Sequence, residues 1–461
     1  MKIKEYIGNK AFYKMTLGIA VPMMVQNLIS NFVSLLDNVM VGALGTEDMS
    51  AVSIVNQLYF VFTLALFGAV SGAGIFTSQY FGKNDEEGIR YTIRFKTVTV
   101  IALTVVASLI FLFAGDFLIG LFLHEGDNSS DLALTAAVAR KYLNIIVIGL
   151  LPFAVSNIFS STLRETGQTV IPMITGFVAV FVNCILNYIL IFGKFGFPAL
   201  GAEGAAIATV IARFVECAVF IIYVVKKKKQ FPFFKGAFKS MYVPKDLLKR
   251  ISVKGMPLLL NEFLWAAGMS ILSMSYSLHG IAVVAGFSIS STVVNLLSIS
   301  FQALGSSISI IVGKLLGAGK FQEAISTVKK MFAFTLFASV IAGACIYFAS
   351  NPILLFYNTS EESKNYAEFF MKTVAFITPI NAFAHASYFT LRSGGKTFVT
   401  FIFDSVFLLG FVVPLAFALF YLGNLSIFII FPIVQCTDII KDIVGFTLIK
   451  KKVWVVNIVG M

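Results

Sequence analysis

The chain has 461 residues, of which 58% are hydrophobic and 13% are charged, and its formal net charge is +12. A soluble chain would have about half apolar and about a quarter charged residues, so this composition excludes an ordinary soluble protein. The positive charge does not indicate a nucleic-acid partner, because the Lys and Arg residues cluster in loops between apolar runs.

The apolar runs are long enough to be helices that cross a membrane. A helix of about 20 residues crosses ~30 Å of hydrocarbon, and a helix satisfies its own backbone groups in lipid. A β-barrel would instead show short alternating segments. The first run lacks a small-residue cleavage site, so it predicts a span and not a signal peptide. We predict an all-α membrane protein with twelve spans: 15–43, 52–80, 95–122, 139–161, 170–192, 204–225, 256–278, 283–313, 331–356, 371–391, 398–421 and 426–449.

The distribution of basic loops predicts the orientation. Lys and Arg accumulate in loops on the cytoplasmic side. The basic stretches are 2–14, 226–255 and 450–452, whereas the loops 46–48, 124–131 and 358–363 are acidic or neutral. We therefore expect a multi-pass protein of the cytoplasmic (inner) membrane with both termini in the cytoplasm. The expected organisation is an N-terminal six-helix lobe (1–225), a basic cytoplasmic linker (226–255) and a C-terminal six-helix lobe (256–461).

No residue pattern in the chain is typical of an enzyme. The cysteines lie inside apolar runs at unrelated spacings, which predicts neither a disulfide framework nor a zinc site. No nucleophile or metal cluster is visible, so we expect neither catalysis nor a cofactor. The cysteines are Cys184, Cys217, Cys345 and Cys436.

The chain contains an internal repeat. Residues 235 positions apart match at three turn or helix-start positions, Pro22 with Pro257, Gly45 with Gly280, and Gly82 with Gly317. At an offset of 228, TLRETGQT (162–169) matches TLRSGGKT (390–397). Because six spans return the chain to the same side, the two halves are expected to be related by a pseudo-two-fold axis along the membrane normal. Parallel repeats of this kind are typical of transporters, with the substrate between the halves and alternating access.

Asp37 is the only charged residue in the apolar run from Leu17 to Leu44. Ionisable groups inside a membrane are costly and usually functional. Its repeat partner is Leu272, so the fold does not require an acid at this position. We interpret Asp37 as a site for H⁺ or Na⁺, and a purely structural carboxylate is the alternative.

Two asparagines in the fifth span share one helix face. Asn183 and Asn187 are four residues apart, and their repeat partners Phe411 and Leu415 are apolar. Thr209 adds a hydroxyl from the sixth span. Amide oxygens can bind a hard cation or a protonated acid. Hydrogen bonding between helices alone is the other interpretation.

The second half carries its own polar candidates. Glu262 follows Asn261 in the seventh span, and His385 in the tenth span matches Asn157 of the first half. Glu262 and His385 lie at similar predicted depth, so a carboxylate–imidazole pair could bind a proton or contact substrate. Alternatively, His385 is a polar residue satisfied inside the bundle.

Several motifs resemble those of the MATE (multidrug and toxic compound extrusion) family, of the multidrug/oligosaccharidyl-lipid/polysaccharide flippase superfamily. They are LDNVMVGALGTEDMSAVSI (36–54), NCILNYILIFG (183–193), GAEGAAIATVIAR (201–213) and the duplicated TLRxxGxT. The resemblance covers essentially the whole chain. It implies two six-helix bundles around a central cavity, and efflux of organic, often cationic, compounds driven by inward flow of Na⁺ or H⁺.

The resemblance also implies a coupling-ion site at Asp37, Asn183, Asn187 and Thr209, for H⁺ or as a possible Na⁺ site. Some relatives carry an aspartate where this chain has Asn187. We therefore predict a monomeric antiporter in the lipid bilayer that acts on small organic substrates. A flippase for a lipid-linked precursor is the alternative. A flippase would need a more basic cavity than this chain is expected to have, because Arg213 is expected to be its main buried cation.

Overall fold

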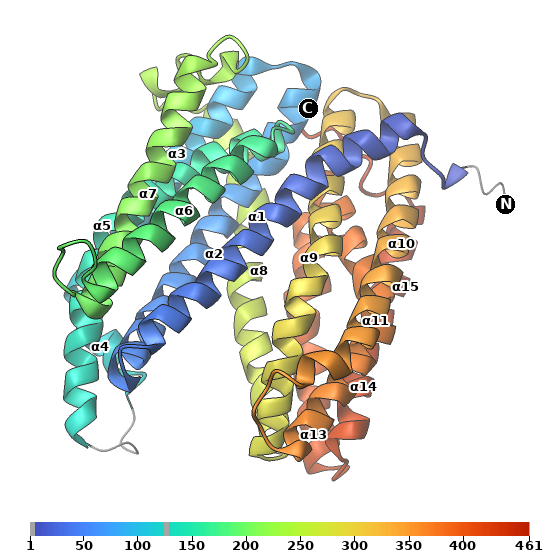
Figure 1. Ribbon diagram of the computed structural model, residues 1–461. Helices are drawn as coiled ribbons and strands as arrows, with labels where there is room; N and C mark the ends of the chain where they lie inside the picture. The colour runs from blue at the N-terminus through green and yellow to red at the C-terminus, as the bar shows by residue number, and fades with distance from the viewer. Residues whose placement is uncertain (1–4, 124–128, 461) are drawn as a thin grey trace. The chain divides into compact units, whose positions relative to one another are not determined.

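The computed structural model describes residues 5–123 and 129–460, without the side chains of residues 33–35 and 129–131. Lys2, Lys4 and residues 124–128 of the acidic or neutral loop 124–131 therefore lie outside the described residues. In the described part of the chain, all regular secondary structure is helical (Figure 1). The predicted all-α fold class is confirmed.

The helices follow the order of the predicted spans. In the first half they are α1 (Lys10–Gly42), α2 (Thr46–Lys83), α3 (Glu86–Phe113), α4 (Gly115–Gly120), α5 (Ser129–Glu165), α6 (Val170–Phe192) and α7 (Gly201–Lys226). Two 3₁₀ turns, η2 (Pro232–Phe234) and η3 (Ala237–Lys239), follow. In the second half they are α8 (Lys245–Ser277), α9 (Ile281–Gly317), α10 (Phe321–Leu354), α11 (Glu361–Ser393), α12 (Thr397–Phe401), α13 (Val413–Tyr421), α14 (Ile427–Cys436) and α15 (Asp438–Lys450). Two π-helical segments, η4 (Ile402–Val406) and η5 (Leu408–Val412), join α12 to α13.

Ten helical stretches of the described chain are long and apolar enough to cross a membrane. The predicted spans 371–391 and 426–449 are not among these ten. The first lies within α11, and the second covers α14 and α15, which meet at Thr437. Each predicted span thus overlaps one helix or a run of consecutive helical segments.

The third span differs from its prediction. It was predicted at 95–122, but α3 runs from Glu86 to Phe113 and is followed by the short α4. Arg140 of α5 donates hydrogen bonds to the carbonyls of Phe111 (3.0 Å) and Leu112 (2.6 Å). These are among the last carbonyls of α3, which lack partners within the helix. The side chain from α5 thus caps α3 where apolar residues continue.

The repeat is visible in the backbone of its turns. Gly167 and Gly395 match at the offset of 228, and both have positive φ, 81° and 72°. Each amide donates to the carbonyl of the motif arginine, at 2.8 Å for Arg164 and 2.9 Å for Arg392. In both copies the amide of the next residue donates to the carbonyl of the motif leucine. A glycine in the left-handed region with this hydrogen-bond pattern is a common way for a helix to end. The two TLRxxGxT motifs therefore end their helices in the same way.

The described contacts divide the chain into two compact units. One comprises residues 1–24, 75–85 and 251–461, and the other comprises residues 25–74 and 86–250. In the second of these, α5 and α6 pack on α7, and α3 packs on α5; in the first, α9, α10 and α11 pack together (Figure 1). Because α1 and α2 contribute to both units, this grouping differs from the predicted lobes 1–225 and 256–461. The division into those two lobes stays a prediction.

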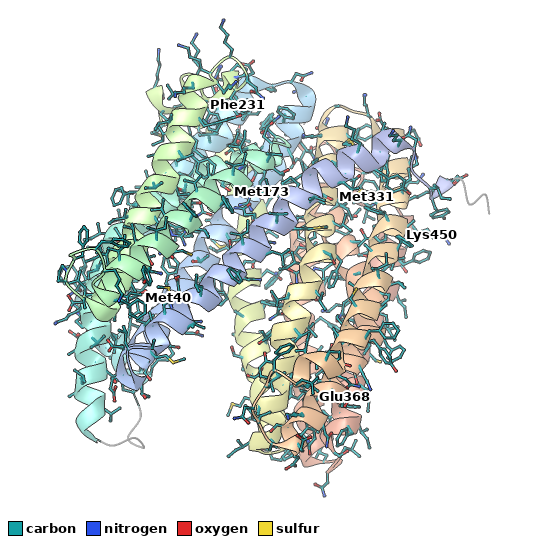
Figure 2. The ribbon with its side chains drawn as sticks, in the orientation of Figure 1. Met40, Met173, Phe231, Met331, Glu368 and Lys450 are labelled. Atoms are coloured by element: carbon teal, nitrogen blue, oxygen red, sulfur yellow. The ribbon has the colours of Figure 1, made fainter. Side chains whose placement is uncertain are left out.

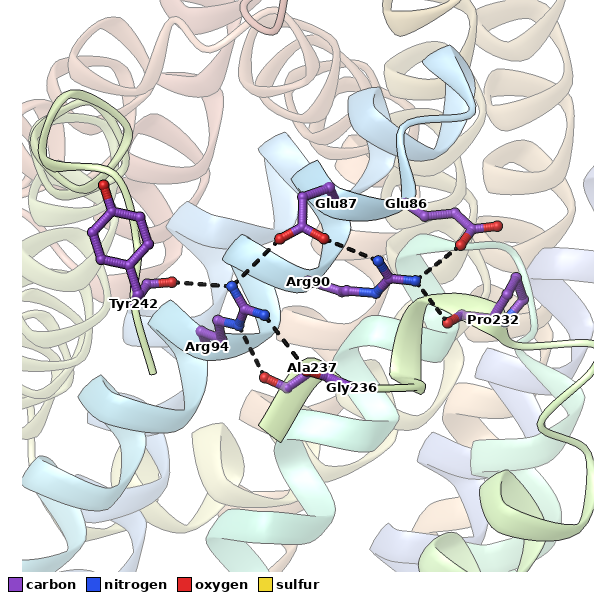
Figure 3. A network of polar contacts seen from close by, with 8 residues as sticks. All are labelled: Glu86, Glu87, Arg90, Arg94, Pro232, Gly236, Ala237 and Tyr242. Atoms are coloured by element: carbon purple, nitrogen blue, oxygen red, sulfur yellow. Dashed lines mark hydrogen bonds and ion pairs between the residues drawn. The ribbon is translucent and has the colours of Figure 1, made fainter. Parts of the chain in front are cut away.

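The first part of the basic central loop is folded onto α3. Arg94 donates to the carbonyls of Ala237 (3.0 Å) and Tyr242 (3.2 Å), and Arg90 donates to that of Pro232 (3.3 Å) (Figure 3). Phe231, labelled in Figure 2, is buried here together with Phe233 and Phe234. This part of the predicted linker is therefore an ordered attachment to the helix.

Candidate functional site

Four residues predicted from the sequence lie together in one hydrogen-bonded chain. Asn187 of α6 donates to the carboxylate of Asp37 in α1, and also to Asn183 Oδ1 at 3.3 Å. Asn183 in turn donates to Thr209 Oγ1 of α7 at 3.3 Å. The first helix and two consecutive later helices, α6 and α7, thus bring their oxygen-bearing side chains to one place.

The local structure explains this grouping. Asn183 and Asn187 are one helical turn apart, so they project from the same face of α6. That face is buried, with Asn183 6% and Asn187 1% exposed. Because α6 and α7 pack along each other, the same face meets Thr209. Because of this i, i+4 spacing, the two asparagines connect Asp37 of α1 to Thr209 of α7 through hydrogen bonds.

One oxygen in this group lacks a partner. Asn187 Oδ1 is buried and accepts no hydrogen bond within the described residues. Asp37 forms no ion pair in residues 5–123 and 129–460, and Arg213 acts on it only through longer-range electrostatics. A carboxylate, an unpartnered amide oxygen and a hydroxyl are oxygen ligands of the kind that suit a proton or a hard cation such as Na⁺. The donor set therefore fits either H⁺ or Na⁺.

A cavity of about 260 Å³ lies beside this group. Asp37, Asn183 and Thr209 contribute to its wall. The remaining polar lining residues are Gln26, Ser30, Ser156, Asn157, Ser160, Arg164, Arg213 and Glu216. All of these residues belong to the unit formed by residues 25–74 and 86–250. The ion-binding candidates thus share a cavity with hydrogen-bonding groups that could contact an organic compound.

Arg213 pairs with an acid on its own helix. Its Nη1 lies 3.1 Å from Glu216 Oε2, and its guanidinium stacks over Phe153 at 4.6 Å from the ring centroid. The expectation that Arg213 is the main buried cation is wrong. Lys96 of α3 is fully buried, and Arg164 of α5 lines the same cavity as Arg213.

Lys96 forms an ion pair that the sequence reading missed. Its ammonium contacts Glu165 of α5 and also donates to Ser161 Oγ (3.2 Å) and Thr162 Oγ1 (3.3 Å). The repeat contained a signal for this pair. Lys96 matches Met331, labelled in Figure 2, and Glu165 matches Ser393, so both charges are present in one half only. The same criterion singled out Asp37.

A second polar centre lies in the other unit, around Asp404. Asn261 of α8 donates to Asp404 Oδ2 at 3.0 Å, and Ser405 donates to Asn261 Oδ1 at 2.7 Å. Lys441 of α15 lies 2.9 Å from Asp438 and 3.9 Å from Asp404. Asp404 and Ser405 lie in a π-helical segment, a feature that often marks functional positions. Sequence reasoning alone did not identify this centre.

Glu262 and His385 are not joined directly. Within the described residues, no hydrogen bond or ion pair links them. His385 lies against the ring of Phe301, with 5.7 Å between centroids. Both groups interact electrostatically with Asp404. Their proposed role as a proton-binding pair therefore stays a prediction, and Asp404 is the residue that relates them.

The comparison with known families decides the identity of the fold and its repeat. The model of the MatE family matches residues 22–189 and again residues 257–443. The chain belongs to the MatE family. The two matched segments lie one in each half of the repeat, so the same family model describes both halves of this MatE chain.

Two relatives match this MatE chain over most of its length. A probable multidrug resistance protein NorM from Thermotoga maritima is 26% identical over 423 residues, which cover 90% of this chain and 88% of the relative. Multidrug resistance protein MdtK from Yersinia pseudotuberculosis is 26% identical, over 75% of this chain and 74% of the relative.

Two solved structures have the same fold. A MOP superfamily transporter from Pyrococcus furiosus matches with a TM-score of 0.84 at 18% identity, over 98% of both chains. An outward-facing multidrug resistance MATE family transporter of the MOP superfamily matches with a TM-score of 0.82, also at 18% identity and over 98% of both chains. At this identity the likeness supports the fold alone.

Proposed function

We propose that this chain is a cation-coupled antiporter that exports organic compounds by alternating access. The names of its relatives, multidrug resistance proteins, support export of xenobiotic compounds. The observation that carries the coupling proposal is the buried group of Asp37, Asn183, Asn187 and Thr209 beside the cavity. The coupling ion is H⁺ or Na⁺, and no other cofactor takes part.

In this mechanism the ion binds at the carboxylate of Asp37, which is the charge that changes. Asn187 orients that carboxylate through its amide hydrogen, and its unpartnered oxygen offers a further ligand. Asn183 and Thr209 complete the oxygen set. A bound ion shifts the balance between inward-open and outward-open states only if it binds one state more tightly than the other. Substrate in the adjoining cavity then competes with the ion or favours the opposite state.

The second polar centre is the further candidate for proton or substrate binding. Glu262 follows Asn261, the hydrogen-bond partner of Asp404, and His385 lies within the electrostatic reach of Asp404. We assign Glu262 and His385 to this centre, with Asp404 as the group that connects them. The transported compounds are expected to be organic cations or larger molecules that contain a cationic group.

The protein is expected to act as a monomer in the cytoplasmic (inner) membrane, with both termini in the cytoplasm. The basic stretches at the N-terminus, in the central loop and at the C-terminus support this orientation. Transport, and not catalysis, is the activity that the names of the relatives and the polar group around Asp37 support.

The test is transport of radiolabelled tetraphenylphosphonium in proteoliposomes, with pH and Na⁺ gradients imposed separately. We expect one gradient to drive transport in the wild type and the Asp37→Asn variant to lose that dependence. Asp246→Asn, which removes an exposed acid at the start of α8, is the matched control and should behave as the wild type. Gradient-driven transport that persists unchanged in Asp37→Asn would exclude Asp37 as the coupling site.

A further inference from the structure

Arg164, in the last turn of α5, lines the cavity beside Asp37 without a partner for its guanidinium. The side chain makes no hydrogen bond or ion pair within residues 5–123 and 129–460, and it is only partly exposed. A charged group that is largely removed from water is costly unless it is paired. Its position in the cavity wall makes it available to a ligand.

The acids close to Arg164 already have partners. Glu165 and Glu216 are the carboxylates that act on Arg164 electrostatically. However, Glu165 forms its ion pair with Lys96, and Glu216 forms its ion pair with Arg213 at 3.1 Å. Arg164 is therefore the cation that remains after the acids around it are paired.

The charges of the cavity wall also leave Arg164 as the unpaired cation. Its charged residues are Asp37, Glu216, Arg164 and Arg213. Arg213 and Glu216 neutralise each other, which leaves Asp37 and Arg164. Under the proposed function, on which this step rests, a proton or Na⁺ neutralises Asp37. The cavity then carries one positive charge, and that charge is on Arg164.

The surrounding groups form a row that can hold an anionic ligand. Asn157, Ser160 and Arg164 follow one another along α5 at spacings of three and four residues, and all of them line the cavity. Residues at these spacings share a helix face. A guanidinium binds a carboxylate through two parallel hydrogen bonds, and nearby amide and hydroxyl groups can add further ones.

We propose that Arg164 binds a carboxylate of the exported compound, so that the protein selects organic zwitterions over simple organic cations. The cationic part of such a compound can remain close to Phe153 and the uncharged polar groups of the wall, whereas the carboxylate pairs with Arg164. One unpaired guanidinium matches a single negative charge. A pyrophosphate group carries more charge than this and would leave part of it unpaired.

The test uses two dyes that differ only in the carboxylate. Rhodamine 110 is a zwitterion, and rhodamine 123 is its methyl ester, a cation. Their affinities are measured by fluorescence anisotropy on the full-length protein in lipid nanodiscs without ion gradients, with empty nanodiscs subtracted. Because charge-assisted hydrogen bonds are strong, we expect rhodamine 110 to bind about tenfold more tightly than rhodamine 123. Equal affinities, a preference for rhodamine 123, or no binding of rhodamine 110 would overturn the proposal.

Variants attribute the preference to one side chain. Arg164→Gln should weaken rhodamine 110 about tenfold but change rhodamine 123 by less than about twofold. Arg164→Lys keeps the charge and should retain most of the preference. Lys228→Gln removes an exposed positive charge outside the cavity and should have no effect. Retained binding of rhodamine 123 reports that Arg164→Gln is folded. An equal loss of both dyes in folded Arg164→Gln, shown by an unchanged thermal midpoint, contradicts a role for the carboxylate.

The result is separable from that for the antiport mechanism. The binding comparison uses no gradient, so a lost dye preference leaves ion-driven export intact. Conversely, gradient-independent transport in proteoliposomes would contradict antiport while leaving the measured carboxylate preference in place.

Discussion

Gly82 of α2 lies directly against the backbone carbonyl of Lys314 in α9. The reverse contact also exists, because Gly317 of α9 lies against the carbonyl of Gln79 in α2. Gly82 matches Gly317 in the repeat, and Gln79 matches Lys314 at the same offset. The two repeat-related helix ends thus cross through a pair of equivalent contacts, each of which has no room for a side chain.

Alanine at either glycine should destabilise this crossing. A methyl group in Gly82→Ala or Gly317→Ala would meet backbone, which cannot move aside as a flexible side chain does. Overpacking of this kind costs about 1–3 kcal/mol, so the thermal midpoint of each purified variant should fall. Gly410→Ala is the control, because its added carbon meets nothing within 4 Å. Unchanged midpoints for both crossing variants would contradict the close contact.

Removal of Lys96 should destabilise the first half strongly. Lys96→Met leaves the carboxylate of Glu165, whose side chain is only 15% exposed, without its cation, and breaking a buried ion pair on one side costs up to about 3–5 kcal/mol. The double variant Lys96→Met with Glu165→Ser carries the residues that the second repeat has at these positions. It should recover most of the lost stability, because no unpaired charge remains. Thermal unfolding of the three proteins measures this, and a double variant as unstable as Lys96→Met would argue against charge pairing.

Gln79 should hold the C-terminal segment to the end of α2. It donates to the carbonyls of Ser393 (2.9 Å) and Val456 (3.2 Å), and it accepts from the amide of Ile458 (2.8 Å). In Gln79→Ala these buried groups lose their partner, at a cost of about 1–3 kcal/mol. Hydrogen–deuterium exchange should then increase in residues 451–460. Gln322→Ala, which truncates an exposed side chain, is the control. Equal exchange in both variants would exclude the attachment of residues 451–460 through Gln79.

Asn187→Leu should change the binding of the coupling ion at Asp37, in opposite directions for Na⁺ and H⁺. The substitution introduces the residue type of its repeat partner, Leu415, and removes both the amide that contacts Asp37 and the unpartnered oxygen. The lost hydrogen bond stabilises the charged carboxylate by about 1.5–3 kcal/mol, so its loss favours the protonated form, and H⁺ as the coupling ion should be needed at an at least about tenfold lower concentration for half-maximal transport. If Na⁺ is the coupling ion, loss of an oxygen ligand should instead raise the Na⁺ concentration for half-maximal transport. Proteoliposome transport at graded ion concentrations measures this. An unchanged ion dependence would show that Asn187 does not contribute to the site.

The sequence alone was sufficient for the course of most helices and for the repeat, whereas the resemblance to the MATE family implied the grouping of Asp37 with Asn183, Asn187 and Thr209. A helix in lipid needs a long apolar run, so the composition of each segment is enough to locate a span. The TLRxxGxT turns are local, because a glycine with positive φ ends a helix whatever surrounds it. Asn183 and Asn187 could be grouped because their spacing places them on one helix face.

Only the tertiary structure decided which charges are paired. The ion pair of Lys96 with Glu165 and the hydrogen bond from the neutral amide of Asn261 to Asp404 each join helices that are separated in the sequence. The rotation of a membrane helix about its axis depends on packing against its neighbours, and a helix that is apolar on every side carries little record of that rotation. Arg164 could be recognised as the unpaired cation only after the partners of Glu165 and Glu216 were known, because pairing is a property of the assembled bundle and not of one segment.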